Sequence, residues 1–161
     1  MHAVVGLGGN LGDAAATLRA VLPALDALPG TRLLRASRLY RTRPWGLREQ
    51  PDFVNAAALV ATGLAPRALL DGLLSIERAF GRDRGAEAGR WGPRRLDLDL
   101  LLYGDRVVDE PGLAVPHPHL HERVFALLPL VEVWPEAAIP GIGPAQAALA
   151  AMAREGIEAL S

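Results

Sequence analysis

The 161-residue chain contains no cysteine and no lysine, and its apolar runs are short. Without cysteine the protein can form no disulfide, thiolate metal site or thiol nucleophile. No uninterrupted apolar stretch reaches the roughly 18 residues that a membrane-spanning helix requires. The first ten residues also lack the basic and apolar regions of a signal peptide. These absences favour a cytoplasmic protein that does not contact membranes.

The charge of the chain is nearly balanced overall but unevenly distributed. A net charge of −1 argues against a general nucleic-acid-binding protein. Six arginines nevertheless fall between residues 78 and 95, where only two acids accompany them. Arginine presents a rigid fork of donors that matches phosphate oxygens. The segment is therefore a candidate anion-binding loop; a solvated charged loop is the alternative, but it does not explain the excess of one sign.

The order of apolar runs and turn signals predicts one domain, residues 1–161, without repeats or linkers. Apolar, β-like segments indicate strands at 3–8, 31–42, 53–62, 96–102 and 106–109. Helical spacing indicates helices at 11–28, capped by Asn10, at 64–81, from 121 up to Pro129, and at 144–156. This order predicts an α+β, ferredoxin-like βαββαβ core with an added hairpin strand and C-terminal helices, the helices packing on a mainly antiparallel sheet.

The strand that follows the arginine-rich segment carries two acids, Asp97 and Asp99, among leucines. Side chains on a strand alternate between faces, so both acids share one face, with Cα atoms about 7 Å apart, while Leu96, Leu98, Leu100 and Leu102 share the other. Two carboxylates this close repel each other unless a cation lies between them. A divalent ion such as Mg²⁺ would resolve the repulsion; a solvated face with ion pairs to arginine is the alternative.

Three further motifs have both a structural and a functional interpretation. The glycine-rich segment 6–12 lacks the third glycine of a dinucleotide-binding fingerprint, so it predicts a tight turn. Three alternating histidines, 117, 119 and 121, form too short a peptide to ligate one metal, although one of them could donate to a phosphate. Phe53 and Asn55 share a strand face and could hold a flat heterocycle, although Phe53 also suits a core position.

Six segments together resemble the 6-hydroxymethyl-7,8-dihydropterin pyrophosphokinase family of the folate pathway. In chain order they are GLGGNLGD, SRLYRTRPWG, QPDFVNAA, IERAFGRDR, RWGPRRLDLDLLLYG and VPHPHLHERVFALLPL, and they span about residues 3 to 135. The combination RWGPR-x-LDLD is the most specific of them. The resemblance implies a ferredoxin-like fold and transfer of the terminal diphosphate of ATP to the pterin hydroxymethyl oxygen, with release of AMP.

The resemblance also implies roles for individual residues. Two Mg²⁺ ions would be held by Asp97 and Asp99, and Arg82 and Arg94 would join these acids in catalysis. ATP would contact Glu77, Arg84, Arg94, the backbone at Leu100, His117 and Arg123. The pterin would lie between Phe53 and Phe125 and bond along its edge to Asn55, Asp97 and the backbone around Thr42, Arg43 and Trp45. Trp91 would help to close a loop over the site.

The predicted activity has two rivals from other functional classes. A ferredoxin-like RNA-binding module would use the arginine loop, but the central strands lack the aromatic cluster that stacks bases. A metal-dependent hydrolase would use Asp97, Asp99 and His117. We expect ATP and the dihydropterin as partners of a monomeric enzyme, no nucleic acid, and closure of segments 43–52 and 82–95 over the bound substrates.

Overall fold

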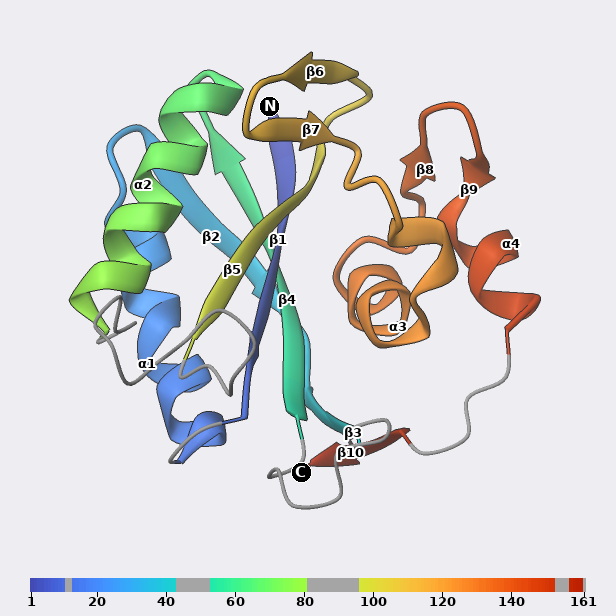
Figure 1. Cartoon of the computed structure of the whole chain (residues 1–161), viewed down its shortest axis with the longest axis horizontal. Helices are drawn as coiled ribbons and strands as arrows, with labels where there is room; N and C mark the ends of the chain where they lie inside the picture. The colour runs from blue at the N-terminus through green and yellow to red at the C-terminus, as the bar shows by residue number, and fades with distance from the viewer. Residues whose placement is uncertain (11–12, 43–52, 81–95, 153–156, 161) are drawn as a thin grey trace.

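The computed structural model describes residues 1–10, 13–42, 53–80, 96–152 and 157–160. Three layers are visible in Figure 1: a twisted sheet, with α1 and α2 on one face and α3 and α4 on the other. The helices are α1 (Ala14–Asp26), α2 (Pro66–Ala79), α3 (Val124–Val133) and α4 (Ala145–Ala150), with a short 3₁₀ helix, η1 (Leu120–Glu122), before α3. No helix in the described ranges is both long and apolar enough to cross a membrane.

The main sheet has the strand order β10-β3-β4-β1-β5, and β2 also pairs with β4. Its strands are β1 (His2–Gly9), β2 (Thr31–Ala36), β3 (Leu39–Thr42), β4 (Phe53–Thr62), β5 (Asp97–Tyr103) and β10 (Ile157–Leu160). Every pair is antiparallel. Two small hairpins, β6 (Val108–Glu110) with β7 (Leu113–Val115) and β8 (Ala138–Ile139) with β9 (Gly143–Pro144), lie outside the sheet. The predicted ferredoxin-like arrangement is confirmed, with β4 in the middle of the sheet and β1 between β4 and β5.

The start of α1 differs from the sequence-based expectation. Asp13, and not Asn10, caps the helix, because its Oδ1 accepts a hydrogen bond of 3.1 Å from the N–H of Ala16. Such a cap stabilises a helix by about 1 kcal/mol. Asn10 instead follows β1 and is only 1% exposed. The helix thus begins at Ala14, three residues after the predicted start.

Each face of the sheet has its own apolar core. The α1/α2 side buries alternate residues of the central strands, namely Ala3, Val5, Leu7, Val54, Ala56, Ala58, Val60, Leu96, Leu98 and Leu100. The α3/α4 side buries Val4, Ala57, Leu59, Leu101 and Leu102 against those helices. Leu102 was expected to share a face with Leu100, which is wrong. A register shift between β1 and β5 at Val4/Val5 places Leu101 and Leu102 on the same side.

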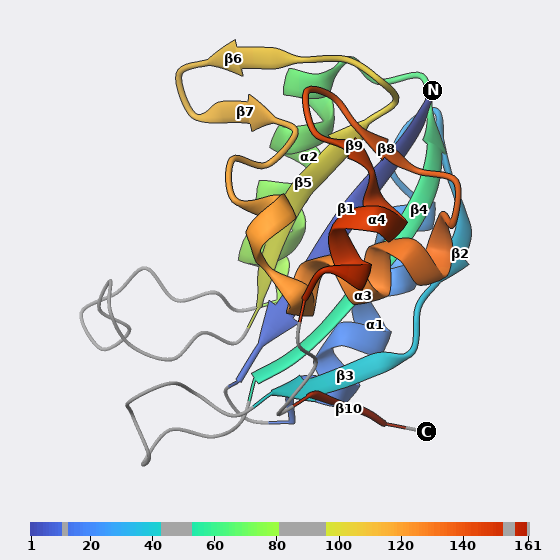
Figure 2. The same cartoon turned by 90° about the vertical axis from the view of Figure 1, so that its right-hand side faces the viewer.

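The C-terminal third of the chain covers the second face of the sheet. Helix α3 was expected to end at Pro129, but it continues to Val133. Proline removes one helical hydrogen bond, and burial of Leu130 and Val133 beyond it offsets that loss. Strand β10 was not expected from the sequence. It pairs with β3, and Figure 2 shows the two strands side by side near the C-terminus.

Candidate active site

A row of four residues crosses the sheet on its α3/α4 face. In the strand register, Tyr40 of β3 pairs with Asn55 of β4, Asn55 pairs with Gly8 of β1, and Gly8 pairs with Asp97 of β5. Directly paired residues on antiparallel strands project from the same face. The row therefore brings together Asn55 and Asp97, two residues that are 42 positions apart in the sequence and that sequence analysis assigned to the same ligand.

Glycines on β1 form the floor of this row. A Cβ atom at Gly8 would lie 2.9 Å from Oδ1 of Asn55, so the Asn55 carboxamide leans over the bare backbone of β1. Gly6 pairs with Asp99, as Gly8 does with Asp97. Opposite both acids, β1 thus offers main chain without side chains. The Leu101 side chain covers Gly6, where an added Cβ would meet its Cδ1 at 3.1 Å, and the Asn55 carboxamide covers Gly8, so these two side chains approach the backbone of β1 beside the two acids.

The two acids lie at the beginning of β5, which is an edge strand. Asp97 is half-buried and Asp99 is exposed, and they share a face as the alternation of side chains predicts. Between them, the N–H of Leu98 donates a hydrogen bond of 2.6 Å to Oε2 of Glu77, a residue of α2 that is 3% exposed. A buried carboxylate from the opposite face therefore holds the backbone between the two acids.

Leu100 can offer a ligand only its main chain. Its side chain is 4% exposed and belongs to the core under α1 and α2. Because N–H groups two residues apart on a strand point to the same edge, the outward N–H of Leu98 implies that the N–H of Leu100 also faces the outer edge of β5. The expected backbone contact of Leu100 with a nucleotide base stays a prediction.

His117 and Arg123 lie close to the acids of β5. The N–H of His117 donates to the carbonyl of Leu101, at 3.0 Å, which places this histidine beside β5. Burial lowers the pKa of His117, the negative charge of Asp99 opposes that shift, and Arg123 adds to it. The imidazole is therefore held neutral near pH 7, and it can donate one N–H to an anion.

Two aromatic rings lie on the α3/α4 side of the sheet. Phe53 begins β4, two residues before Asn55, and so projects from the same face. Phe125 lies in the first turn of α3, is 37% exposed, and has the guanidinium of Arg123 6.0 Å from its ring centroid. Thr42, at the end of β3, pairs with Phe53. Phe53, Asn55 and Asp97 thus project from one face near one end of the sheet, and Thr42 lies beside Phe53.

The remaining predicted site residues lie outside the described residues. They are Arg43, Trp45, Arg82, Arg84, Trp91 and Arg94. Sequence analysis in turn missed two residues near the site, Tyr40 and Glu132, which hydrogen-bond to each other. Glu132 is the only charged residue in the ten-residue helix α3, and that isolation was the signal available in the sequence.

The described part of the site suits Mg²⁺, which takes many of its ligands from water and substrate, better than a metal that takes all its ligands from protein side chains. Within the described ranges, no three His, Asp or Glu side chains gather closely enough to hold an ion alone. Mg²⁺ is commonly held by one or two carboxylates together with water and substrate phosphates. Asp97 and Asp99 supply two carboxylates on one face, so the pair suits an ion that a phosphorylated ligand brings with it.

Comparison with known proteins identifies the family. Residues 4–135 match the family model of 7,8-dihydro-6-hydroxymethylpterin-pyrophosphokinase, HPPK. The chain belongs to this family. The 2-amino-4-hydroxy-6-hydroxymethyldihydropteridine pyrophosphokinase of Pseudomonas aeruginosa is 46% identical over 156 residues, which cover 97% of this chain and 94% of that protein. The protein of the same name from Methylorubrum extorquens is 44% identical over 157 residues, which cover 98% and 97%.

Solved structures agree with the HPPK fold. The chain aligns with a crystal structure of a Plasmodium falciparum HPPK-DHPS variant with SDX-DHP at a TM-score of 0.73 and 15% identity. The alignment covers 92% of this chain but 45% of that protein, so the chain spans less than half of its length. At this level of identity the likeness supports the fold alone, and the function follows from the family and the closer relatives.

Proposed function

We propose that the row from Asn55 through Gly8 to Asp97, together with Asp99, is the active site of the HPPK reaction. That reaction transfers the diphosphate of ATP to the hydroxymethyl group of 6-hydroxymethyl-7,8-dihydropterin and yields the pterin diphosphate and AMP, in tetrahydrofolate biosynthesis. The observation that carries this assignment is the strand register, which aligns Asn55 and Asp97 on either side of Gly8. An amide and a carboxylate across a bare glycine suit the polar edge of a pterin.

The reaction requires an in-line displacement at the β-phosphorus of ATP. The hydroxymethyl oxygen forms a bond to that phosphorus, the bond to the oxygen bridging the α- and β-phosphates breaks, and the hydroxyl proton is released. Because such transfers demand little covalent chemistry from the protein, catalysis rests on positioning and on charge stabilisation. No described side chain needs to act as a firm general base in this scheme.

The phosphate end of the site would be formed by Asp97, Asp99, His117 and Arg123. Two Mg²⁺ ions held by Asp97 and Asp99 would neutralise charge on the phosphates when bound. His117 would donate its N–H to a phosphate oxygen, which is consistent with its lowered pKa. Arg123, half-buried at the start of α3, would add a positive charge on the nucleotide side. Glu77 would act on the nucleotide side through the edge of β5, where it holds Leu98.

The pterin end would be formed by Phe53, Phe125 and Asn55. Stacking between two aromatic rings orients a flat heterocycle, and the Asn55 carboxamide can both donate and accept hydrogen bonds along its edge. Thr42 pairs with Phe53 and leads into residues 43–52, so its main chain lies near the same end. The pterin would thus occupy the space above Gly8, with its hydroxymethyl group directed toward Asp97 and the phosphates.

The arginine-rich segment would complete the site. We propose that Arg84 and Arg94 bind phosphate oxygens, that Arg82 acts as a movable catalytic arginine, and that Trp91 helps to close the segment over the ligands. Arg43 and Trp45 would contact the pterin edge through their main chain. All six residues lie outside the described residues, so these assignments stand on the family resemblance and on the excess of arginine over acids.

The experiment that tests the function is product analysis of the purified chain with Mg-ATP and the dihydropterin. Formation of AMP and pterin diphosphate in equal amounts, absent when the pterin is left out, is the expected result. Chelation of metal by EDTA should stop the reaction, and added Mg²⁺ should restore it. Release of inorganic phosphate from ATP without pterin would contradict the proposal and favour a hydrolase.

Three further properties are part of the proposal. We expect one domain over residues 1–161, a monomer, and a cytoplasmic location. Light scattering coupled to size-exclusion chromatography tests the second, because a monomer should elute as a single species of 17.1 kDa, and a single cooperative unfolding transition tests the first. Cell fractionation tests the third.

A further inference from the structure

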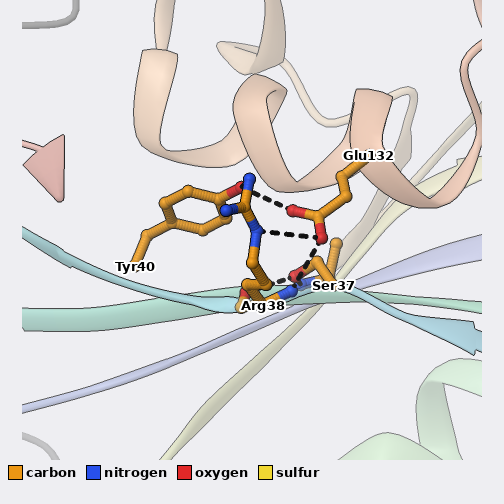
Figure 3. Close-up of polar contacts among 5 residues, drawn as sticks. Ser37, Arg38, Tyr40 and Glu132 are labelled. Atoms are coloured by element: carbon orange, nitrogen blue, oxygen red, sulfur yellow. Dashed lines mark hydrogen bonds and ion pairs between the residues drawn. The ribbon is translucent and has the colours of Figure 1, made fainter. Parts of the chain in front are cut away.

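A polar cluster connects α3 to the sheet beside the row of site residues (Figure 3). The carboxylate of Glu132, in the last turn of α3, accepts hydrogen bonds from the hydroxyl of Tyr40 at 2.5 Å and from the main-chain N–H of Arg38 at 3.0 Å. The guanidinium of Arg38 lies 3.4 Å from the same carboxylate and also donates to the Tyr40 hydroxyl, at 3.1 Å. The three side chains close a ring of contacts between helix and strand.

A break in the strand pairing makes this contact possible. Between β2 and β3, Ser37 bonds to β4 in place of a regular ladder: its N–H donates to the carbonyl of Ala57, and its hydroxyl accepts from the N–H of Ala57, both at 2.9 Å. The main-chain N–H of the next residue, Arg38, points to Glu132 instead of to β4. The backbone at this junction thus presents a donor to the helix.

The position of Glu132 on α3 is electrostatically unfavourable without a partner. A carboxylate in the last turn of a helix faces the negative end of the helix dipole, and α3 has no basic residue in that turn. Arg38, at the junction between β2 and β3, supplies the missing positive charge. Burial raises the pKa of Tyr40, and its bond to Glu132 raises that pKa further, so the hydroxyl stays protonated as a donor. The bond between Tyr40 and Glu132 is therefore a partly buried, specific contact, to which the exposed Arg38 side chain adds a charge from the surface.

The rest of α3 gives little information about how the helix is rotated. Its sequence is VFALLPLVEV, apolar at every position except Glu132. Apolar packing is non-directional, so the apolar sequence alone favours no one rotation; in the structure Leu127, Leu130 and Val133 are buried, and Glu132 adds the one polar side-chain contact of the helix. Phe125 precedes Glu132 by seven residues, which is close to two helical turns. The two side chains therefore project from the same side of α3, and fixing one fixes the direction of the other.

The same cluster reaches the other wall of the site. Tyr40 is 3% exposed and is the direct cross-strand partner of Asn55, so its ring flanks the Asn55 side chain on the side away from Gly8. On the opposite side of Asn55, its Oδ1 lies over Gly8. Glu132 thus connects, through Tyr40, the helix that carries Phe125 with the strand that carries Asn55.

We infer that Glu132, Tyr40 and Arg38 are positioning residues that set the rotation of α3 and thereby the orientation of Phe125 toward Asn55 and the pterin. The inference rests on the proposed function only for the identity of the ligand. The claim that the cluster sets the rotation of α3 and the orientation of Phe125 is independent of that function. Loss of the cluster should weaken pterin binding more than ATP binding, because the acids of β5 are held independently by Glu77, whereas Arg123 is the one proposed ATP contact that α3 carries.

The first test measures the surroundings of Phe125 directly. The chain has three phenylalanines, Phe53, Phe80 and Phe125, so protein labelled with 4-fluorophenylalanine gives three ¹⁹F resonances. Phe125→Leu assigns the relevant one. In Glu132→Gln, and in Arg38→Gln as a second variant, the Phe125 resonance should shift or broaden while that of Phe80, which packs under the opposite face, stays in place.

The second test separates the two substrates. Tyr40→Phe removes only the hydroxyl, and it should raise the KM for the pterin roughly tenfold while the KM for ATP stays within about twofold of the wild-type value. Glu132→Gln should behave in the same way. The control is Glu110→Gln, which removes an exposed contact with Arg67, 3.1 Å long, near α2 and should change neither KM.

Two results would overturn the inference. One is an unmoved Phe125 resonance in both Glu132→Gln and Arg38→Gln. The other is a fall in thermal stability of Tyr40→Phe with both KM values unchanged, which would make the cluster purely structural. The NMR measurement uses no substrate, so it remains decisive even if the wild-type chain fails to transfer diphosphate and the proposed function is wrong.

Discussion

The buried carboxylate of Glu77 accepts a hydrogen bond from the main-chain N–H of Leu98, the residue between Asp97 and Asp99. Glu77→Ala should therefore leave this buried donor without its partner and lower the free energy of unfolding by about 1–3 kcal/mol. It should also lower kcat, because the backbone between the two acids is no longer held. Urea unfolding and an AMP-release assay measure the two effects.

Two companion variants sharpen the Glu77 experiment. Glu77→Gln keeps an acceptor oxygen and should lose less stability than Glu77→Ala. Asp71→Ala removes an exposed acid from the same helix and should change neither stability nor rate. Equal stability of Glu77→Ala and the wild-type chain would contradict the role assigned to this hydrogen bond.

Asp99 combines exposure with a central place in the proposed metal site. Asp99→Asn should reduce turnover by roughly 100-fold or more, because one of the two carboxylates for Mg²⁺ is lost. Its free energy of unfolding should stay within about 0.5 kcal/mol of the wild-type value, as is usual for exposed positions. Asp105→Asn, in the exposed turn after β5, is the control. Full activity of Asp99→Asn would remove this carboxylate from the site.

Gly8 allows the Asn55 carboxamide to lean over β1. Gly8→Ala places a methyl group 2.9 Å from Oδ1 of Asn55 and should displace the amide, which is the movable end of a side chain. We expect a higher KM for the pterin, little change in the KM for ATP and a small change in melting temperature. Gly63→Ala, where the added Cβ meets no atom closer than 3.9 Å, serves as the control. Equal pterin KM values for the two variants would argue against the proposed pterin position.

The C-terminal strand supports the end of β3. Thr42 pairs with Phe53 on one side and with Ile157 on the other, and Leu160 packs on the core. A chain that stops after residue 156 should bind the pterin more weakly, because the strand leading into residues 43–52 loses one neighbour. Calorimetry of a pterin analogue with a Mg-ATP analogue measures the loss.

The matched variant for this truncation is Glu158→Ala. It removes only the exposed ion pair with Arg41 and should cost about 0.5 kcal/mol or less. If the truncated chain binds the pterin as tightly as the full chain does, β10 plays no part in the site.

The raised pKa of Tyr40 predicts a loss of stability in alkali. Burial and the bond to Glu132 raise this pKa in the folded chain above the ordinary value of 10.0. Above pH 10 the unfolded chain loses the tyrosine proton more readily than the folded chain does. The stabilisation that the protonated Tyr40 gives the folded chain is therefore fully present below pH 10 and is lost as the pH rises through the folded pKa. Urea unfolding at pH 9 and pH 11 should show a larger loss for the wild-type chain than for Tyr40→Phe; equal losses would contradict the assignment.

Side-chain alternation was sufficient to predict much of the fold and of the site. Strand β4 has the predicted bounds, 53–62, and the two acids of β5 share a face because their spacing matches the period of a strand. The expectation failed at Leu102, because a β-bulge is a property of two paired strands and neither sequence shows it alone. It also failed at Asn10, because the capping residue depends on where the chain turns after β1.

The other differences come from tertiary packing. Helix α3 continues through Pro129 because residues on both sides of the proline are buried against the sheet. Strand β10 has only four residues, IEAL, too few for an alternating apolar pattern to stand out in the sequence. Its pairing with β3 makes it a strand. The contact between Tyr40 and Glu132 joins residues 92 positions apart, and no local pattern predicts such a partner.

Strand β4 carries two independent sets of residues on its two faces. Val54, Ala56 and Ala58 belong to the core under α1 and α2, whereas Phe53 and Asn55 project toward the candidate site. Changes selected for thermostability and changes selected for a different heterocycle can therefore accumulate at alternate positions of one strand with little interference. A mutational library that varies Phe53 and Asn55 separately from Val54, Ala56 and Ala58, and leaves the buried Ala57 and Leu59 unchanged, would tune substrate preference and heat resistance as two separate traits.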